Sequence, residues 1–283
     1  MKYVIVMPAK NESEFIARCL NSIITQSCLP TKLIIVDDSS TDNTKLIAEE
    51  YSKKYTWMRV LQKSSPPEIR SGGSKVVETF NHGFAFIHDD EWEFIVKLDA
   101  DLELPTNYFE SIINTFASDE KIGITGGMIY NKVGSEFIKE GTINYHVRGA
   151  FKAYRKACFQ DIGGLKPIWG WDGIDEMGAI YNGWTTKVLE IMVKHYRITS
   201  SAYDPKTHAF MSGYEAYRIR MNFILFLARA VHKLFARPYL LYSYYFMKGF
   251  LHAIVLKPDR IIDKDFASFI TKFHFKRVLN IFQ

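Results

Sequence analysis

The sequence predicts an α/β protein with a mostly parallel central sheet, flanking helices and a helical C-terminal extension. Short apolar runs alternate with amphipathic segments through the first 130 residues, a pattern typical of βαβ units. One of these runs ends on Leu98-Asp99-Ala100-Asp101, as expected where a strand reaches the edge of a sheet. The length of 283 residues suits one such domain plus an extension, which we place at 1–200 and 201–283.

The apolar runs predict strands at residues 2–8, 32–37, 57–62, 93–99 and 122–129. Between them, apolar side chains spaced as on one face of a helix predict helices at residues 13–26, 42–55, 74–88 and 106–118. Thr41-Asp42 and Pro105-Thr106 are typical helix starts. The first 130 residues therefore read as strand and helix in strict alternation.

Beyond residue 140 the pattern is less regular. Residues 142–153 favour an extended segment, 172–182 a helix ended by Gly183, and 185–193 a strand. Residues 214–256 are rich in Phe, Leu, Tyr and Ile, but basic residues interrupt them every few positions. No window of eighteen uncharged apolar residues occurs, so a membrane-spanning helix is not expected. Helices in a membrane interface, core-packed helices and a dimer interface are all compatible with this pattern.

The composition excludes several classes of protein. Apolar residues at 47% and charged residues at 24% are typical of a globular chain and not of a disordered one. Cys19, Cys28 and Cys158 lie too far apart to indicate a disulfide framework or a zinc knuckle, which favours a reducing cytoplasm. Residues 1–7 are too short for the apolar segment of a signal peptide, and they predict a buried first strand.

The net charge of +5 hides an asymmetry along the chain. From Lys194 onward there are 15 Lys and Arg against 5 Asp and Glu, a net of +10, and the preceding residues carry 21 against 26, a net of −5. The basic tail is also rich in aromatic and aliphatic side chains, which suits an anionic membrane surface better than nucleic acid. We therefore expect a cytoplasmic protein at the inner face of the cell membrane, with no nucleic-acid partner.

The acidic loops after three predicted strands indicate a ligand site. Residues 8–12 follow the first strand and Asp37-Asp38 end the second, and parallel strands bring these loops to the edge that holds Asp99 and Asp101. Two hard oxygen ligands there suit Mg²⁺ or Mn²⁺ carrying a diphosphate. Asp37 or Asp38 can accept hydrogen bonds from a base or from ribose hydroxyls, whereas Asp42 is better placed to cap a helix.

A glycine-containing segment, Gly72-Gly73-Ser74-Lys75, precedes the third predicted helix. It could place backbone N–H groups and one ammonium beside a phosphate. Neither the spacing of a P-loop nor a Gly-x-Gly-x-x-Gly fingerprint after the first strand is present in the sequence. The sequence thus predicts an enzyme of nucleotide diphosphates that is neither a P-loop protein nor a dinucleotide-binding dehydrogenase.

Four motifs, in this order, resemble family 2 glycosyltransferases of the glycosyltransferase A fold: Pro8 to Glu12, Val36 to Asp42, Gly73 to Gly83 and Leu98 to Asp101. The resemblance covers residues 1 to about 200, with 1–130 as the nucleotide-sugar half and 131–200 as the acceptor half. It implies transfer of a sugar, with inversion, from a UDP- or GDP-linked donor to a lipid-linked or polysaccharide acceptor. It also implies a divalent metal, manganese or magnesium.

The resemblance implies roles for individual residues as well. Asp99 and Asp101 would hold the metal, and His195, in a tract similar to a His-x-Arg of some relatives, would ligate it or bind phosphate. Arg197 lies beside His195, and Trp169 and Trp171 could stack on an acceptor sugar or belong to the core. The implied nucleotide-binding residues are Pro8, Ala9, Asn11, Glu12, Asp37, Asp38, Lys75, Asp99 and Ala100.

Inversion needs a base, which such families place in a Glu-Asp pair at a helix start. Counting back from Gly183-Trp184, where that helix usually ends, reaches Asp172, with Trp171 in the place of the usual Glu. Asp175 and Glu176 are rivals because either could reach the same helix end. A carboxylate near an acceptor hydroxyl can take its proton as the oxygen attacks.

Two other functions are compatible with parts of this pattern. A sugar nucleotidyltransferase also uses a divalent metal on a similar sheet, but it usually carries a Gly-rich basic loop where this chain has Pro8-Ala9-Lys10-Asn11-Glu12. A non-catalytic, membrane-bound adaptor could keep the fold without the chemistry, although Asp99, Asp101 and Asp172 are all present. The acidic motifs favour the glycosyltransferase.

Overall fold

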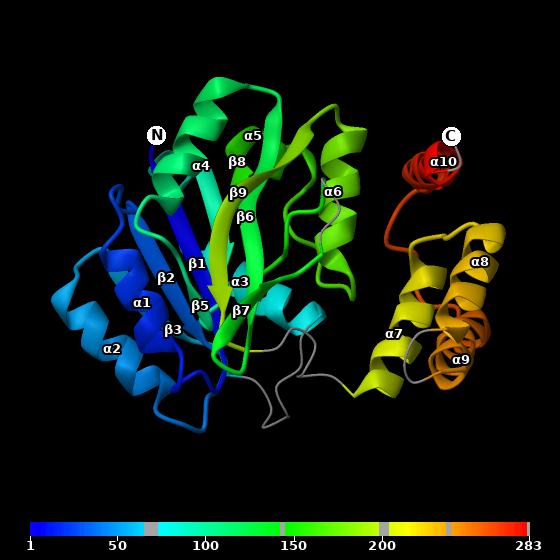
Figure 1. Cartoon of the computed structure of the whole chain (residues 1–283), viewed down its shortest axis with the longest axis horizontal. Helices are drawn as coiled ribbons and strands as arrows, with labels where there is room; N and C mark the ends of the chain where they lie inside the picture. Colours follow the sequence, from blue (N-terminus) through cyan, green and yellow to red (C-terminus); the bar gives the residue numbers. More distant parts are fainter. Residues whose placement is uncertain (65–72, 142–144, 198–203, 236–238, 282–283) are drawn as a thin grey trace. The chain divides into compact units, whose positions relative to one another are not determined.

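The computed structural model describes residues 1–64, 73–141, 145–197, 204–235 and 239–281 (Figure 1). The chain divides into two compact units, which we treat separately. The sheet unit comprises Met1–Pro167 and Trp171–Ser201, and the helical unit comprises Ile168–Gly170 and Ala202–Gln283.

The sheet unit is built on a nine-stranded sheet with the strand order β3-β2-β1-β4-β8-β6-β9-β5, in which β7 pairs with β6 (Figure 1). The strands are β1 (Tyr3–Ala9), β2 (Lys32–Asp37), β3 (Met58–Gln62), β4 (Phe94–Leu98), β5 (Leu102–Glu103), β6 (Ile122–Val133), β7 (Glu136–Lys139), β8 (Phe151–Arg155) and β9 (Thr185–His195). The strands predicted from the first 130 residues are all present, and they carry the α/β fold.

The direction of the strands divides the sheet into two halves. β3, β2, β1 and β4 are parallel, as predicted. β8 then runs antiparallel to both β4 and β6, and β6 is parallel to β9. The sheet is therefore mixed where the sequence predicted a mostly parallel one, because a run of apolar residues carries no information on strand direction.

Two features of this second half differ from the predicted elements. The extended segment predicted at 142–153 is a strand only from Phe151 onward, residues 142–144 lie outside the described residues, and 145–150 form turns and coil. The strand predicted at 122–129 continues to Val133 and pairs with β7 across a two-residue turn that begins at Gly134, with φ +62°. Gly-Ser between two extended runs is a hairpin signal.

Helices cover both faces of the sheet: α1 (Ile16–Ile24), α2 (Thr44–Lys54), α3 (Ser74–Phe84), α4 (Tyr108–Ser118), α5 (Lys156–Asp161) and α6 (Trp171–Tyr181), with a short 3-10 turn at Asp89–Glu91. The predicted helices are all present, each shorter than predicted by a few residues at its ends. One core cluster joins alternate side chains of β1, β4 and β8 to α1, α2 and α4. On the other face α3 packs so closely that a Cβ at Gly83 would meet Val6 and Val36 at 2.7 Å.

Two lysines stand in the otherwise apolar strands β4 and β8. Lys97 and Lys152 are both buried, and both ammonium groups lie over the ring of Trp171, at 5.4 and 5.8 Å from its centroid. They lie on the face opposite the α1, α2 and α4 core, because their neighbours in the strands belong to that core. Helix α6 therefore covers a charged patch of the sheet.

The helical unit contains α7 (Pro205–Arg218), α8 (Phe223–Leu234), α9 (Leu241–Leu256) and α10 (Lys264–Ile281). α7 and α9 touch through glycines: a Cβ at Gly213 would lie 1.8 Å from the Phe246 carbonyl oxygen, and one at Gly249 would lie 1.9 Å from that of Phe210. A small core of Ala216, Phe226, Ala230 and Phe246 joins α7 to α8 and α9.

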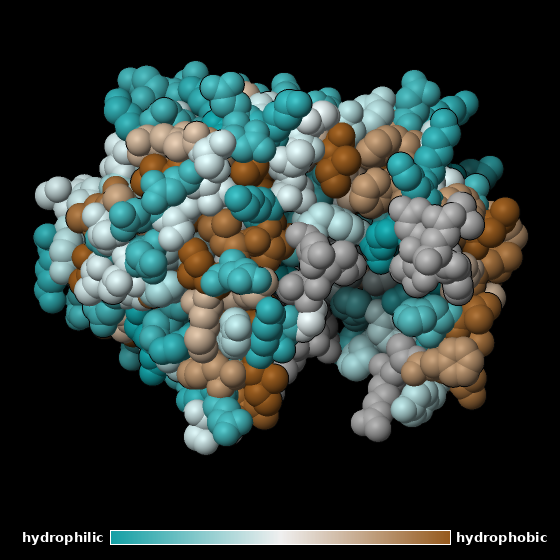
Figure 2. Space-filling view, turned by 45° about the horizontal axis from the view of Figure 1, so that its top comes forward, coloured by the Kyte–Doolittle hydropathy of each residue, from teal (hydrophilic) through white to brown (hydrophobic). Residues whose placement is uncertain are grey.

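Large apolar side chains remain exposed on two helices of this unit. They recur at helical spacing on faces opposite the buried ones, as Phe223, Ile224, Leu227 and Val231 on α8 and as Tyr244, Met247, Leu251 and Val255 on α9. Figure 2 shows brown, hydrophobic residues at the right-hand edge of the view, where these helices lie. In the described parts of the chain, no helix combines the length and the apolarity needed to traverse a bilayer.

Candidate active site

The loops after β1 and β2 are joined into one structure at the edge of the sheet. Asn11 has φ 54°, which is an uncommon left-handed conformation, and its side-chain oxygen accepts a hydrogen bond from the Thr41 N–H at 2.8 Å. The Ala9 carbonyl accepts from the Asp38 N–H at 2.8 Å. Asp42 accepts from the N–H groups of Thr44 and Ser13, so it caps this region as predicted. Pro8, Ala9 and Asn11 therefore shape the loop edge.

The two carboxylates that end β2 are both buried. Asp37 is 1% exposed; one of its oxygens accepts from the Ser40 N–H at 3.2 Å, and the other, Oδ1, has no hydrogen-bond partner among the described residues. Asp38 forms an ion pair with Lys63 at 3.2 Å. A buried acceptor without a donor is costly, so Asp37 is suited to a ligand that brings an N–H or O–H group.

Asp99 and Asp101, which follow β4, face different partners. Asp99 is partly exposed and contacts the Lys97 ammonium, and its N–H donates to the Ala150 carbonyl at 2.8 Å. Ala100 is buried between them. Asp101 is 2% exposed, and its Oδ2 lies 3.4 Å from His195 Nε2 and 3.6 Å from Arg197 Nε. The tetrapeptide thus meets the end of β9.

His195 and Arg197 link Asp101 to the β1 loop. The Arg197 guanidinium donates to Glu12 Oε2 at 2.7 Å, and Glu12 is itself buried. His195 Nδ1 lies 2.9 Å from Asn131 Oδ1, which directs Nε2 toward Asp101. We call Glu12, Asp101, His195 and Arg197 the edge cluster. These residues, up to 185 positions apart in sequence, come together at one edge of the sheet.

The edge cluster has the donor set of a site for a divalent metal completed by phosphate. Carboxylate and imidazole ligands suit Mn²⁺, and a metal-bound His usually has its second ring nitrogen held by a hydrogen bond, as Asn131 holds His195. Among the described residues, no group of three or more His, Cys, Asp and Glu side chains is arranged to hold a metal. Ions of this kind commonly take only one or two protein carboxylates and complete their shell with substrate phosphates and water.

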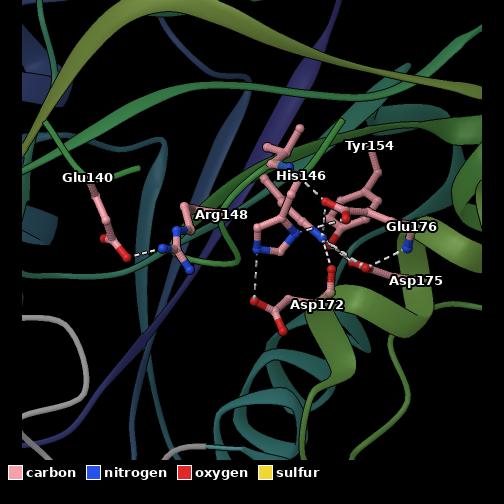
Figure 3. Close-up of polar contacts among 9 residues, drawn as sticks. Glu140, His146, Arg148, Tyr154, Asp172, Asp175 and Glu176 are labelled. Carbon is pink, nitrogen blue, oxygen red and sulfur yellow. Dashed lines mark hydrogen bonds and ion pairs between the residues drawn. The ribbon is translucent and has the colours of Figure 1, made fainter. Parts of the chain in front are cut away.

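A second group of charged residues surrounds the start of α6 (Figure 3). Asp172, Asp175 and Glu176 project from the helix toward Lys152 and Tyr154 of β8 and toward His146 of the preceding loop. We call these six residues the α6 cluster. The side chain of Arg148 lies beside it and pairs with Glu140.

Burial sorts the three carboxylates of the α6 cluster. Asp175 and Glu176 are nearly inaccessible, and Lys152 Nζ lies 2.8 Å from Asp175 Oδ1 and 3.0 Å from Glu176 Oε1. The Tyr154 hydroxyl also donates to Asp175. The side chain of Asp172, by contrast, is 33% exposed, while its backbone carbonyl accepts from Lys152. Asp172 is therefore the carboxylate of this group that an incoming hydroxyl can reach.

The pKa values of the α6 cluster follow from burial against neighbouring charges. Burial lowers the pKa of Lys152, but Asp175, Glu176 and Asp172 raise it above its ordinary value. Burial raises the pKa of Asp175, and Glu176 adds to this, although Lys152 opposes both. Burial lowers the pKa of His146, but the hydrogen bond and the charge of Glu176 outweigh it, so the pKa is raised. Lys152 is thus a fixed positive charge at the base of the group.

The remaining predicted residues lie in different surroundings. Trp171 is 7% exposed and packs against Gly149, Lys97 and Lys152, so its ring belongs to the interior of the sheet unit. Trp169 lies in the helical unit, with its ring centroid 5.4 Å from that of His208. Lys75 is in the first turn of α3, after Gly73 with φ 68°, and Gly72 lies outside the described residues.

Sequence reasoning missed three members of the α6 cluster: His146, Lys152 and Tyr154. They come from the segment whose pattern was least regular. A usable signal existed in Lys152, because a lysine in the middle of an apolar strand indicates a buried counter-charge.

Comparison with known proteins assigns the chain to a family. Residues 4–165 match the sequence model of glycosyl transferase family 2. An uncharacterized glycosyltransferase of Escherichia coli, YibD, is 27% identical over 119 residues, which are 42% of this chain and 31% of that protein. Poly-beta-1,6-N-acetyl-D-glucosamine synthase of Staphylococcus epidermidis is 24% identical over 204 residues, 65% of this chain and 45% of that protein. The matches thus cover less than half the length of these relatives.

Solved structures share the fold at low sequence identity. TarS 1–349 of S. aureus in complex with UDP-GlcNAc has a TM-score of 0.58 and 20% identity, over 89% of this chain and 72% of that one. The mannosyltransferase PcManGT of Pyrobaculum calidifontis, in complex with GDP-Man and Mn²⁺, has a TM-score of 0.58 and 13% identity, over 98% and 80%. The family match covers more than half of the 283 residues, and the chain belongs to glycosyl transferase family 2.

Proposed function

We propose that this protein is a metal-dependent, inverting glycosyltransferase of glycan synthesis. It transfers a sugar from a nucleotide-diphosphate sugar to a hydroxyl of a lipid-linked or polysaccharide acceptor. The observation that carries the proposal is the edge cluster, in which His195 Nε2 is directed at Asp101 Oδ2 at 3.4 Å, next to the buried Asp37. This edge offers groups for a base, for a diphosphate and for the cation between them.

The printed ligands of structural relatives support a donor of this class. TarS is described with UDP-GlcNAc and PcManGT with GDP-Man and Mn²⁺. Relatives in sequence include a poly-beta-1,6-N-acetyl-D-glucosamine synthase and a poly(ribitol-phosphate) beta-glucosyltransferase, whose products are polymers. We extend to this chain a UDP- or GDP-linked donor and a glycan acceptor.

The donor is held by groups that the structure leaves ready for it. Asp37 Oδ1 accepts a hydrogen bond from the nucleoside, since this buried oxygen has no donor among the described residues. Asp101 and His195, with Asp99 nearby, hold the metal, and Arg197 lies beside them as a second positive charge. When bound, a divalent cation neutralises the diphosphate that leaves.

Asp172 acts as the base in the proposed reaction. Its carboxylate takes the proton of the acceptor hydroxyl while the acceptor oxygen bonds to the anomeric carbon and the bond from that carbon to the diphosphate oxygen breaks. Asp175 is less suited to this role because Lys152 and Tyr154 engage both of its oxygens inside the protein. Asp172 is the more accessible of the two.

Turnover of sugar nucleotides with Mn²⁺ tests the proposal. The full chain is incubated with UDP-N-acetylglucosamine or GDP-mannose, and release of UDP or GDP is measured with and without EDTA. Release that requires Mn²⁺ and that increases with added glycan acceptor is the expected result. Pyrophosphate release from a sugar phosphate and a nucleoside triphosphate would instead identify a nucleotidyltransferase. Failure to bind UDP or GDP with Mn²⁺ by calorimetry would indicate a non-catalytic adaptor.

We also infer that the protein is cytoplasmic and binds the inner face of the cell membrane through α8 and α9. Exposed apolar side chains of these helices, such as Leu227 and Leu251, alternate with exposed Arg229 and Lys248. Amphipathic helices of this kind lie in the interface and their basic side chains reach the headgroups. The three cysteines are free thiols, which agrees with a reducing compartment.

Vesicle flotation tests this location. We expect the full chain to float with vesicles of phosphatidylglycerol and phosphatidylcholine, and to float less at high salt, because screening weakens attraction to anionic lipids. Leu251→Glu combined with Val255→Glu should abolish flotation. Leu46→Glu, an equally exposed apolar position on α2, is the matched control. A concentration-dependent dimer that does not float would assign the same surface to a second copy.

A further inference from the structure

His146 stands between two carboxylates of the α6 cluster, and its place there is not explained by packing alone (Figure 3). We propose that His146, anchored by Glu176, is a positioning residue that keeps the carboxylate of Asp172 ionised and correctly oriented toward the acceptor. This inference rests on the proposed role of Asp172 as the base and adds a second residue to that role.

The anchor of His146 is rigid. Glu176 is 1% exposed, and its Oε1 accepts from the Val147 N–H at 2.7 Å and lies 3.0 Å from Lys152 Nζ. Its Oε2 lies 2.9 Å from His146 Nδ1. Both carboxylate oxygens are therefore engaged, and they hold the imidazole ring in one orientation.

The other ring nitrogen points at Asp172. His146 Nε2 lies 3.9 Å from Asp172 Oδ2, an ion-pair distance that a small rotation of the partly exposed Asp172 side chain can shorten to a hydrogen bond. Because Nδ1 donates to Glu176, only the protonated imidazole can donate to Asp172 as well. Such a contact fixes Oδ2 and leaves Oδ1 of Asp172 for the acceptor hydroxyl.

The surrounding charges favour that protonated state. Glu176 and Asp172 on α6 raise the pKa of His146, while burial and Lys152 on β8 lower it, and the net direction is upward. Asp175 and Tyr154 are engaged with each other and with Lys152. On its own loop, Arg148 is paired with Glu140. The imidazolium is thus the positive group that lies beside Asp172 at its exposed end.

The arrangement has a chemical consequence for the base. A positive neighbour keeps Asp172 deprotonated to lower pH, so that the base is available over a wider range. When His146 loses its proton, as pH rises, Nε2 no longer donates to Asp172, and the orientation of the carboxylate is lost. Turnover should therefore fall on the alkaline side as the imidazolium is titrated.

The first arm of the test is the pH dependence of turnover. UDP-N-acetylglucosamine and GDP-mannose, each with Mn²⁺, are supplied to the wild-type protein, to His146→Gln and to the control His82→Gln. We expect His146→Gln to lower kcat about 10- to 100-fold, the range for loss of a hydrogen bond between charged groups, to leave KM for the donor unchanged, and to lose the alkaline limb. His82→Gln should follow the wild-type profile. An unchanged kcat and an unchanged alkaline limb in His146→Gln would overturn the inference.

The second arm needs no activity. The carbon-bound protons of His146 are titrated by NMR in the wild-type protein and in Asp172→Asn, and both variants are first checked for a cooperative unfolding transition. Removal of the negative charge should lower the pKa of His146, and a titration identical to wild type would overturn the inference. If the wild-type protein turns over no sugar nucleotide, the proposed function fails, and with it the base; if it does and the NMR titration ignores Asp172→Asn, the inference alone fails.

Discussion

The edge cluster and the α6 cluster balance their negative charge in opposite ways. In the edge cluster, the positive partners of Glu12 and Asp101 are Arg197 and His195, at and just beyond the end of β9, and the Arg197 side chain is 24% exposed. In the α6 cluster, the main positive partner is Lys152, which is fully buried within β8. One counter-charge lies at a partly open edge, and the other is fixed in the sheet.

This difference separates the tasks of the two groups. A guanidinium at an open edge can turn toward a phosphate when a metal ion takes over its carboxylate, because little packing holds it. A buried ammonium cannot leave, since an unpaired charge in the interior costs several kcal/mol. The edge cluster is thus suited to exchange its partners during donor binding, whereas the α6 cluster is suited to hold one carboxylate, Asp172, in a constant environment.

The largest expected effect is the loss of donor binding in Asp101→Asn. This change keeps the size of the side chain but removes the charge that a divalent cation needs, so transfer should fall to background and Mn²⁺-dependent binding of UDP or GDP should disappear. Calorimetry with the nucleoside diphosphate, with and without Mn²⁺, measures this. The matched control is Glu120→Gln, an exposed carboxylate outside both clusters, which should bind as wild type. Wild-type binding by Asp101→Asn would remove the metal from the edge cluster.

The next effect sharpens the division within the α6 cluster. Asp172→Asn should lower the rate of transfer by about 10²- to 10⁴-fold, as expected for loss of a general base, with donor binding and thermal stability close to wild type. A rate within twofold of wild type would exclude Asp172 as the base.

The companion change, Asp175→Asn, should act on stability instead. It leaves Lys152 with one carboxylate partner fewer in the interior, and breaking a buried pair costs about 3–5 kcal/mol, so thermal unfolding should occur at a clearly lower temperature. If Asp175→Asn unfolds as wild type but is inactive, the roles of the two aspartates are exchanged.

The two clusters also differ in how far the sequence predicted them. The edge residues follow apolar strands whose order and parallel direction are local patterns, so Asp37, Asp99 and Asp101 were predicted at one edge. Asp172 was reached by counting from Gly183. The pairing of Arg197 with Glu12 was not predicted, because it joins residues 185 positions apart and no local pattern encodes it.

The unpredicted part of the α6 cluster has a different physical cause. Lys152 and Tyr154 lie in β8, which runs antiparallel to β4, and a short strand after an irregular segment gives no signal of its direction or neighbours. A lysine at such a position is normally assigned to the solvent face of a strand. It is buried here because α6 supplies carboxylates directly above it, a fact of tertiary packing alone.

The smallest expected effect concerns stability and pH. The pKa of His146 is raised in the folded protein, chiefly by Glu176 against the opposing effect of burial, so the folded state binds this proton more tightly than the unfolded chain does. The stabilisation is complete below about pH 6.5, the ordinary pKa of histidine, and it is lost as pH rises through the pKa in the folded state. The free energy of unfolding in urea should therefore differ more between wild type and His146→Gln at pH 6 than at pH 8. Asp175, whose pKa is also raised, changes stability in the same direction in both proteins, and the difference between them cancels most of its contribution. An equal difference at the two pH values would show that Glu176 does not bind the protonated imidazole, and the α6 cluster would then be balanced by Lys152 alone.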